Sequence, residues 1–263
     1  MKTFLYTLVI GLFVVTGCGN PQTDLRNKID SLTAELDKQQ SGQGRADLAN
    51  LQATYVDTYP ADSVSKAYLE NISFYYLMVD STTLAKKYAN QYLTQYPEDQ
   101  NANDIALVVT KAELKEKNYK VAVAAFESVQ QNTMLSVTDM RSLGEALLAL
   151  AEDDDMDGND VYYFKHAAIL EQTQGMQASI DALSMFQTKY PESKIGPSVM
   201  MVYADKLEKN GDIDEAKSVL NVIISQYPES SQAATAKSML DNQLVGLTAE
   251  EQLEKILKNK SSN

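Results

Sequence analysis

Apolar residues recur every three or four positions through most of this chain, a period that predicts amphipathic α-helices rather than strands. The clearest stripe lies between Ser136 and Ala151. Its apolar members are Val137, Met140, Leu143, Leu147 and Leu150. We expect one helix over this segment, with Gly144 at a point where a neighbouring helix can come close.

A shorter stripe precedes the main body of the chain. Leu25, Ile29, Leu32 and Leu36 are spaced four, three and four residues apart, as in the seam of a coiled coil, but the pattern lasts two heptads at most. The segment is therefore predicted either as a short stalk or as a single helix docked on the following helices. Residues 39–44, rich in Gly, Gln and Ser, are predicted to form a flexible hinge.

The far end of the chain carries a helix-start signal. Thr248 and Glu251 have the spacing of a capping box. They predict a final helix through Leu253, Ile256 and Leu257, which either caps the preceding elements or binds elsewhere.

Between these ends the sequence repeats itself. Tyr-Pro pairs stand at Tyr59-Pro60, Tyr96-Pro97, Tyr190-Pro191 and Tyr227-Pro228, and the first two and the last two are each 37 residues apart. A period in this range marks stacked helix pairs, because one pair cannot bury its apolar face alone. The predicted fold is all-α, a solenoid of helical hairpins preceded by a short N-terminal helix.

The repeat register resembles that of the tetratricopeptide repeat, which has small residues at positions 8 and 20 and a proline at position 32. Aligning Pro97, Pro191 and Pro228 with position 32 puts small residues at both places in three units. These residues are Ser73 and Ala85, Ala167 and Ser179, and Ala204 and Ala216. A fourth unit lacks the proline but keeps Thr110 and Ala122 there. Small side chains allow close helix packing, and proline stops the second helix.

Together with an apolar run near the N-terminus that ends at the lone Cys18, these patterns divide the chain into six predicted segments. They are a signal peptide (1–17), an anchored helical stalk with its hinge (18–44), N-terminal repeats (45–134), an extra helix with an acidic loop (135–160), C-terminal repeats (161–242) and a C-terminal helix with its tail (243–263).

The first residues predict export. Lys2 precedes an apolar run of about a dozen residues, shorter than the roughly 20 that a membrane-spanning helix needs. The run closes on Val15-Thr16-Gly17-Cys18, which resembles the lipobox of bacterial lipoproteins, and Cys18 is the only cysteine of the chain. The resemblance implies cleavage before Cys18 and a lipid on its sulfur. The implied location is the cell envelope, at the outer membrane and facing the periplasm.

The net charge and the absence of catalytic motifs argue against two classes of function, nucleic-acid binding and catalysis. The net charge of −13 disfavours nucleic acid as a partner. The single histidine, His166, falls at an inward repeat position and is predicted to be packed, and no nucleophile motif or phosphate loop occurs. We therefore expect a protein without enzyme activity, cofactor or small-molecule substrate.

One acidic loop is a candidate for chemistry. Asp153, Asp155, Asp157 and Gly158 match the first half of a calcium-binding loop, but the twelfth position, which needs a bidentate glutamate, is Phe164. The alternative interpretation is a solvated turn between two helices, with Asn159 or Asp160 as the N-cap of the second.

The tetratricopeptide resemblance also implies a binding groove lined by the first helix of each unit. The predicted groove positions are Glu70, Phe74, Leu77, Leu107, Lys111, Leu114, Phe164, Ala168, Glu171, Met201, Asp205 and Glu208. This mixed apolar and acidic lining favours a partner with Lys or Arg beside apolar anchors.

Two families combine a lipobox or an N-terminal coiled coil with such repeats. The chain resembles the tetratricopeptide lipoprotein of the outer-membrane β-barrel assembly machinery and the periplasmic coordinator of the Tol-Pal system. Both resemblances imply a scaffold that binds envelope proteins in outer-membrane assembly or maintenance, and the lipobox that the chain shares with the first family implies membrane anchoring. A surface-exposed nutrient-capture lipoprotein and a calcium-dependent adhesin using residues 153–158 are the alternatives, and the chain has no Trp to stack on sugars.

Overall fold

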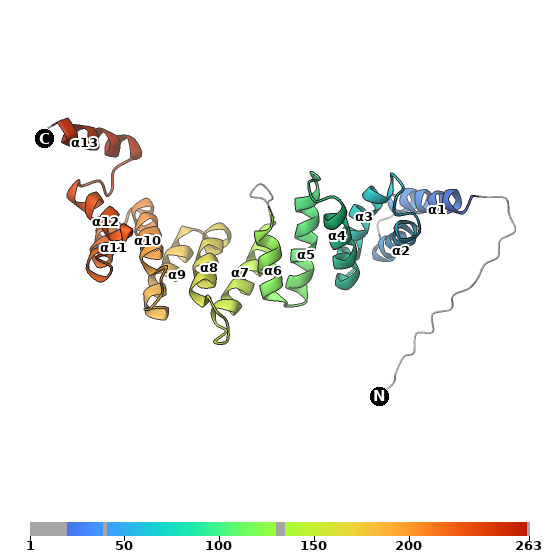
Figure 1. Cartoon of the computed structure of the whole chain (residues 1–263), viewed down its shortest axis with the longest axis horizontal. Coiled ribbons are helices and arrows are strands. Elements are labelled where there is room, and N and C mark those ends of the chain that lie inside the picture. The colour runs from blue at the N-terminus through green and yellow to red at the C-terminus, as the bar shows by residue number, and fades with distance from the viewer. Residues whose placement is uncertain (1–19, 39–40, 130–134, 262–263) are drawn as a thin grey trace. The chain divides into compact units, whose positions relative to one another are not determined.

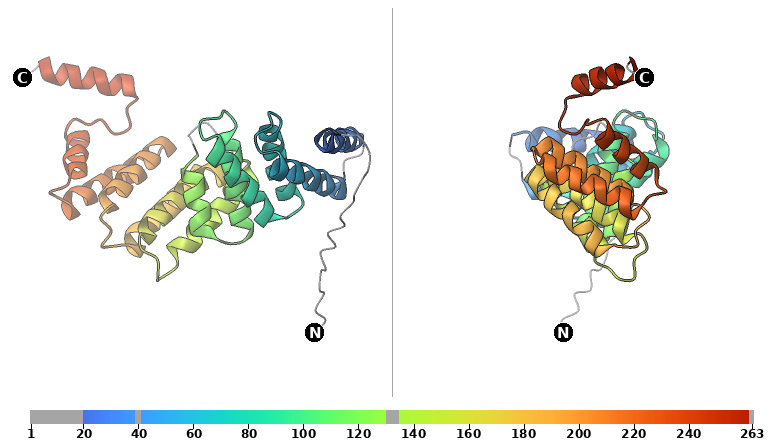
Figure 2. Two further views of the ribbon diagram at one scale, coloured as in Figure 1. Left: turned by 45° about the vertical axis from the view of Figure 1, so that its right-hand side comes forward. Right: turned by 90° about the vertical axis from the view of Figure 1, so that its left-hand side faces the viewer.

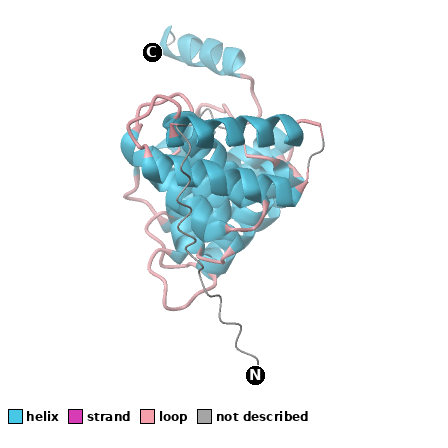
Figure 3. Ribbon diagram, turned by 90° about the vertical axis from the view of Figure 1, so that its right-hand side faces the viewer, coloured by secondary structure: helices cyan, strands magenta, loops and turns pink. Residues whose placement is uncertain are grey.

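The computed structural model describes residues 20–38, 41–129 and 135–261. These residues form thirteen α-helices, and no strand occurs among them (Figure 3). The all-α prediction is confirmed. The helices are α1 (Pro21–Leu36), α2 (Gly42–Thr58), α3 (Ser65–Met78), α4 (Thr82–Gln95), α5 (Ala102–Lys115), α6 (Tyr119–Glu127), α7 (Val137–Ala151), α8 (Asn159–Gln174), α9 (Met176–Lys189), α10 (Gly196–Asn210), α11 (Ile213–Gln226), α12 (Ser231–Asp241) and α13 (Ala249–Ser261).

The chain divides into two compact units. The first ends at Ser81 and contains α1, α2 and α3. The second begins at Thr82 and contains α4 to α13. The boundary falls within the first predicted repeat, so α3 and α4 belong to different units.

Helix α1 is the first arm of a hairpin, not a free stalk. Ile29 and Leu36 of α1 are buried with Leu48 and Tyr55 of α2 in one apolar cluster, so the docked-helix alternative is the one observed. The seam leucines Leu25 and Leu32 pack against the edge of that cluster. The apolar spacing of a coiled coil is satisfied here by one neighbouring helix of the same chain.

The predicted hinge is partly helical. Helix α2 begins at Gly42, and its N-cap Ser41 accepts a hydrogen bond from the Gly44 N–H at 2.9 Å. A Cβ on Gly44 would lie 2.8 Å from Leu36 Cδ1. Gly44 therefore permits close contact between α2 and the end of α1. The prediction of a flexible hinge, which rested on composition, was wrong for Gly42 to Gly44 because these residues begin a helix.

The second unit is a run of helices in which each packs on the next from α4 to α12 (Figures 1 and 2). Three apolar clusters lie in its core from α5 to α12, and Tyr88, Tyr92 and Ile105 are buried on α4 and α5. One lies around α10, α11 and α12, one around α8, α9 and the start of α10, and one joins α5 to α8. The small residues that fit the repeat register, among them Ala85, Ala122, Ser179 and Ala216, are all buried.

The Tyr-Pro pairs end helices in a common way. The Tyr190 N–H donates to Phe186 O at 2.8 Å, and the Tyr227 N–H donates to Ile223 O at 2.9 Å. Both tyrosines then leave the helical region, with φ near −130° and ψ of 62° and 51°. The following proline cannot donate a backbone hydrogen bond and disfavours helical backbone in the residue before it, so the helix stops.

The third residue after each tyrosine builds the turn. Its backbone N–H donates to the tyrosine carbonyl at 2.9 to 3.2 Å, and its side-chain oxygen accepts a backbone N–H two or three residues further on. Asp and Ser are suited to both tasks. These residues are Asp62, Asp99, Ser193 and Ser230.

The predicted extra helix is α7, and it packs on α5, α6 and α8. Its N-cap Ser136 accepts from the Asp139 N–H at 3.1 Å. Gly144 is buried where α8 crosses, and a Cβ on it would lie 2.9 Å from Ile169 Cγ2. The predicted N-cap of the next helix was wrong, because α8 starts at Asn159 and its N-cap is Gly158 at φ 83°.

The chain beyond α12 departs from the hairpin pattern. Leu244 and Val245, in the connection between α12 and α13, are buried, and Val245 belongs to the last core cluster. Helix α13 then lies beyond the stacked helices (Figure 2), with Leu253 and Leu257 exposed. Among the described residues, no helix is long and apolar enough to cross a membrane.

Candidate binding surfaces

The predicted groove residues are spread over both units. Glu70, Phe74 and Leu77 are on α3 in the first unit, and Leu77 is buried there. The other predicted positions are on α5, α8 and α10 in the second unit. The two pockets that the predicted groove residues border both lie within the second unit.

On α5, Lys111 faces the inserted helix α7. Its ammonium lies 2.9 Å from Asp139 Oδ2. Burial disfavours ionisation of Asp139, but hydrogen bonds from Ser136 and Lys111 outweigh it and lower the pKa of this carboxyl. Leu114 is half-buried, and Leu107 is buried in the cluster that joins α5 to α8. Lys111 thus fixes α7 against α5 in addition to any role on a surface.

On α8 and α10, the charged side chains also pair. Lys206 of α10 forms an ion pair and hydrogen bond with Glu171 of α8. Phe164 packs against the cluster around α8 and α9, and Met201 packs against the last core cluster. The Glu171–Lys206 pair therefore joins α8 to α10 at one of the predicted groove positions.

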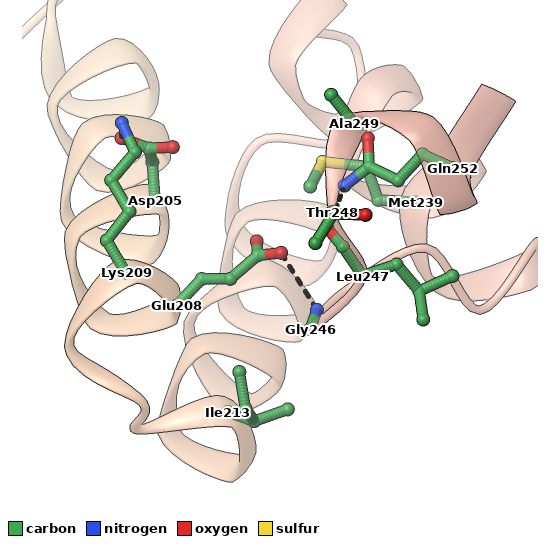
Figure 4. Close-up of a pocket in the computed structure, with 10 residues that line it drawn as sticks. All are labelled: Asp205, Glu208, Lys209, Ile213, Met239, Gly246, Leu247, Thr248, Ala249 and Gln252. Carbon is green, nitrogen blue, oxygen red and sulfur yellow. Dashed lines mark hydrogen bonds and ion pairs between the residues drawn. The ribbon is translucent and has the colours of Figure 1, made fainter.

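Asp205 and Glu208 line a pocket of about 490 Å³, which we call the C-terminal pocket (Figure 4). The helix α10 contributes Asp205, Glu208 and Lys209. Opposite them lie Thr248, Ala249 and Gln252 at the start of α13. Apolar side chains of Ile213, Met239 and Leu247 complete the lining.

Hydrogen bonds hold the two sides of this pocket in place. Glu208 Oε1 accepts the Gly246 N–H at 2.8 Å, which ties α10 to the connection before α13. Gln252 Nε2 donates to the carbonyls of Leu244 and Leu247 at 3.2 and 3.1 Å. Asp205 Oδ2 accepts from the Lys209 ammonium at 2.7 Å, and this bond raises the pKa of Lys209.

The capping box expected at Thr248 is present. Glu251 Oε2 accepts the Thr248 N–H at 2.7 Å and the Thr248 hydroxyl at 2.9 Å. Thr248 Oγ1 in turn accepts the Glu251 N–H at 3.4 Å. These bonds lower the pKa of Glu251 and define the start of α13 beside the pocket.

A second depression, which we call the apolar pocket, lies where α6, α7 and α8 meet. It measures about 260 Å³. Phe126, Leu143, Leu147 and Ala168 are among its lining residues, and the Lys165–Glu127 ion pair lies at its side. Helix α6 has nine residues where α4, α9 and α11 have fourteen, so it covers less of α7 and α8.

The acidic loop does not gather its carboxylates. Asp153 Oδ1 accepts the Asp155 N–H at 3.1 Å, and the Asp153 carbonyl accepts from the Asn159 side chain at 2.7 Å. Among the described residues no group of three or more His, Cys, Asp or Glu side chains could hold a metal ion. This arrangement is that of a helix-connecting turn, and Asp157 is exposed in it.

His166 is half-buried and packed between helices. Its Nδ1 lies 2.7 Å from the carbonyl oxygen of Gly144, so the ring bridges α8 and α7. The predicted lipidation site Cys18 lies outside the described residues, and its lipidation stays a prediction.

The sequence prediction did not include two features of the structure, one in the turns after the Tyr-Pro pairs and one at the C-terminal end. The sixth residue after each tyrosine is small and buried, namely Ser65, Ala102, Gly196 and Ala233. A Cβ on Gly196 would lie 3.0 Å from the Tyr227 hydroxyl, which shows how tightly the next turn packs there. The alignment of the four Tyr-Pro pairs contains this signal. The contribution of residues 246–252 to a pocket had no local signal, because it depends on where α13 points.

Comparison with known proteins agrees with this fold. Residues 203–230, which cover the second half of α10, all of α11 and the following turn, match the family model described as tetratricopeptide repeat. A search of curated proteins gives no match to the chain. The match and the all-helical architecture together identify a helical-hairpin solenoid, a fold that typically serves as a non-catalytic scaffold for protein–protein interactions.

Proposed function

We propose that this protein is a membrane-anchored scaffold that binds partner proteins in the bacterial cell envelope. The observation that carries the proposal is the tetratricopeptide match at residues 203–230, next to a pre-formed pocket lined by Asp205 and Glu208. Repeat hairpins of this kind present side chains from successive helices to an extended or helical peptide. No rearrangement of the fold is needed to expose the C-terminal pocket.

The anchoring half of the proposal is supported by the N-terminal sequence. Cys18 closes an apolar run with a lipobox-like string, and acyl chains on its sulfur and amino group supply the two lipid signals that stable attachment requires. The net charge of −13 opposes adsorption on anionic lipid, so the acyl chains are the anchor. Outer-membrane attachment with the repeats in the periplasm is the proposed arrangement.

Crosslinking in living cells tests the scaffold function. The tagged chain is crosslinked, extracted in detergent and analysed by mass spectrometry, beside the charge reversals Asp205→Lys and Glu208→Lys combined. We expect envelope proteins, including assembly or maintenance components, with the wild type and markedly fewer with the variant. Reversal of Glu192 and Glu229, two exposed turn carboxylates, is the control for net charge. Equal recovery by all three proteins contradicts the assigned surface.

Metabolic labelling with a fatty-acid analogue tests the anchor separately. We expect label on the wild type and none on Cys18→Ser, which should also leave the membrane fraction. An unlabelled wild-type chain would refute lipid anchoring and leave the scaffold function to the crosslinking result.

A further inference from the structure

We infer that the C-terminal pocket receives a lysine or arginine side chain of a partner segment, with an apolar residue of the same segment packed beside it. This inference rests on the proposed scaffold function and specifies the partner's chemistry. It assigns recognition to one pocket formed by α10 and the start of α13, instead of to a groove along all repeats.

The carboxylate oxygens that line the pocket favour binding of a cationic side chain. Glu208 uses Oε1 for the Gly246 N–H, and Asp205 uses Oδ2 for the Lys209 ammonium. Among the described residues, Glu208 Oε2 and Asp205 Oδ1 accept no hydrogen bond. A carboxylate offers about four acceptor sites, so both can accept further donors without losing their present bonds. Two carboxylates against the ammonium of Lys209 leave the lining one charge negative.

The apolar side chains of the pocket suit the rest of such a residue. Ile213, Met239 and Leu247 line it together with the carboxylates. Lysine and arginine bury their aliphatic stems on apolar surface while the charged end stays with polar groups. The volume of about 490 Å³ leaves space for a neighbouring apolar side chain as well.

The pocket is organised before any partner binds. The Gly246–Glu208 bond, the two bonds from Gln252 and the Thr248–Glu251 capping box fix the wall that faces α10. A pre-formed wall reduces the ordering cost of binding. The overall charge of −13 attracts basic segments to the protein at long range, whereas the placed carboxylates select the side chain.

A peptide selection followed by a double-mutant cycle tests this assignment. A phage-displayed library of random twelve-residue peptides is panned against the purified full chain in detergent. We expect enriched peptides to carry Arg or Lys next to apolar residues. Their affinities are then measured by fluorescence polarisation, with each basic residue also replaced by Gln in turn.

The protein variant of the cycle is Asp205→Asn with Glu208→Gln. Asn and Gln keep a side-chain acceptor for Lys209 and Gly246, so the fold is preserved while the two charges are removed. We expect about tenfold or greater loss of affinity, because charge-assisted hydrogen bonds are lost. Replacing the critical basic residue of the peptide should weaken binding to the wild type and have little further effect on the variant. Glu192→Gln with Glu229→Gln is the matched control and should bind as the wild type does.

Each failure has a separate meaning. Enriched peptides without a basic residue, or basic peptides whose binding shows no coupling to Asp205 and Glu208, overturn the pocket assignment and leave the scaffold function standing. A library that yields no binder contradicts the cation pocket directly, and the in-cell crosslinking result then decides the scaffold function. Loss of affinity in the control variant would mean that net charge, not the pocket, is recognised.

Discussion

The hairpins α10/α11 and α5/α6 follow the same register but cover their neighbours to different extents. Helix α11 has fourteen residues and ends at Tyr227-Pro228. Helix α6 has nine residues and ends at Glu127 without a Tyr-Pro pair. Position 24 of the repeat is Leu220 in the first hairpin, where it is 1 % exposed, and Phe126 in the second, where it is half-buried beside the apolar pocket. Among the described residues, the longer second helix closes its core, whereas the shorter one leaves apolar surface open beside Phe126.

The largest expected effect comes from truncating position 24. Leu220→Ala leaves a cavity in the core around α10, α11 and α12 and should cost about 2–5 kcal/mol of unfolding free energy. Phe126→Ala should cost less, although phenylalanine is larger, because its ring already borders an open pocket. Urea denaturation of the two variants measures the difference. An equal or larger loss for Phe126→Ala would contradict the comparison.

The next effect concerns close contacts at two glycines, Gly144 on α7, which packs on the α5/α6 hairpin, and Gly196 at the start of α10. A Cβ on Gly144 would lie 2.9 Å from Ile169 Cγ2, so Gly144→Ala should cost about 1–3 kcal/mol by overpacking α7 against α8. Gly196→Ala should cost less, because the atom that it meets at 3.0 Å is the far end of the Tyr227 side chain. Thermal unfolding ranks the two.

A double-mutant cycle shows whether the Gly144 cost comes from this contact. In an Ile169→Ala background, Gly144→Ala should be much less damaging, because the clashing methyl is gone. A full, additive cost in that background would mean that Gly144 acts through the helix backbone instead.

At position 20, one substitution is expected to raise the unfolding free energy instead of lowering it. Ser179 is fully buried, and its hydroxyl has no hydrogen-bond partner among the described residues, whereas α11 has Ala216 at the same position. Ser179→Ala should therefore stabilise the protein by about 1 kcal/mol, and Ala216→Ser should destabilise it by about 1–3 kcal/mol. The midpoint of urea unfolding reports both. Destabilisation by Ser179→Ala would imply a bound water or another partner for the hydroxyl.

Much of this fold could be predicted from the sequence because its signals are local and periodic. The Tyr-Pro pairs, the small residues at positions 8 and 20 and the α7 stripe each depend on residues close together in the chain. The docking of α1 could not be chosen over a stalk, because the same leucine spacing fits either. Gly44 was assigned to a hinge because its role depends on contact with Leu36, a tertiary fact that composition does not carry.

The candidate site could be predicted only in part for the same reason. The register placed Asp205 and Glu208 on one helix face, and both line the C-terminal pocket. The same register placed Lys111 beside them in a groove, but α7 supplies Asp139 as its partner. The Gly246–Glu208 bond spans 38 residues, so no local pattern indicates that the connection before α13 forms the opposite wall. Sequence periodicity therefore predicts which side chains share a helix face. Whether that face is exposed depends on elements outside the repeat, such as α7 and the connection before α13.

The smallest expected effect separates the neutral cap of α12 from the ionisable cap of α13. Ser230 caps α12 by accepting the Ala233 N–H at 3.0 Å, whereas α13 depends on the Glu251 carboxylate. Since hydrogen bonds from the Thr248 backbone and hydroxyl lower the pKa of Glu251 below its ordinary value of 4.5, the cap contributes stability above that pH and loses it as the pH falls through the lowered value. Backbone NMR should show the Thr248 amide titrating in this acidic range and the Ala233 amide unaffected by it. In Glu251→Gln the Thr248 titration should vanish, and a titration that persists would assign it to another carboxylate.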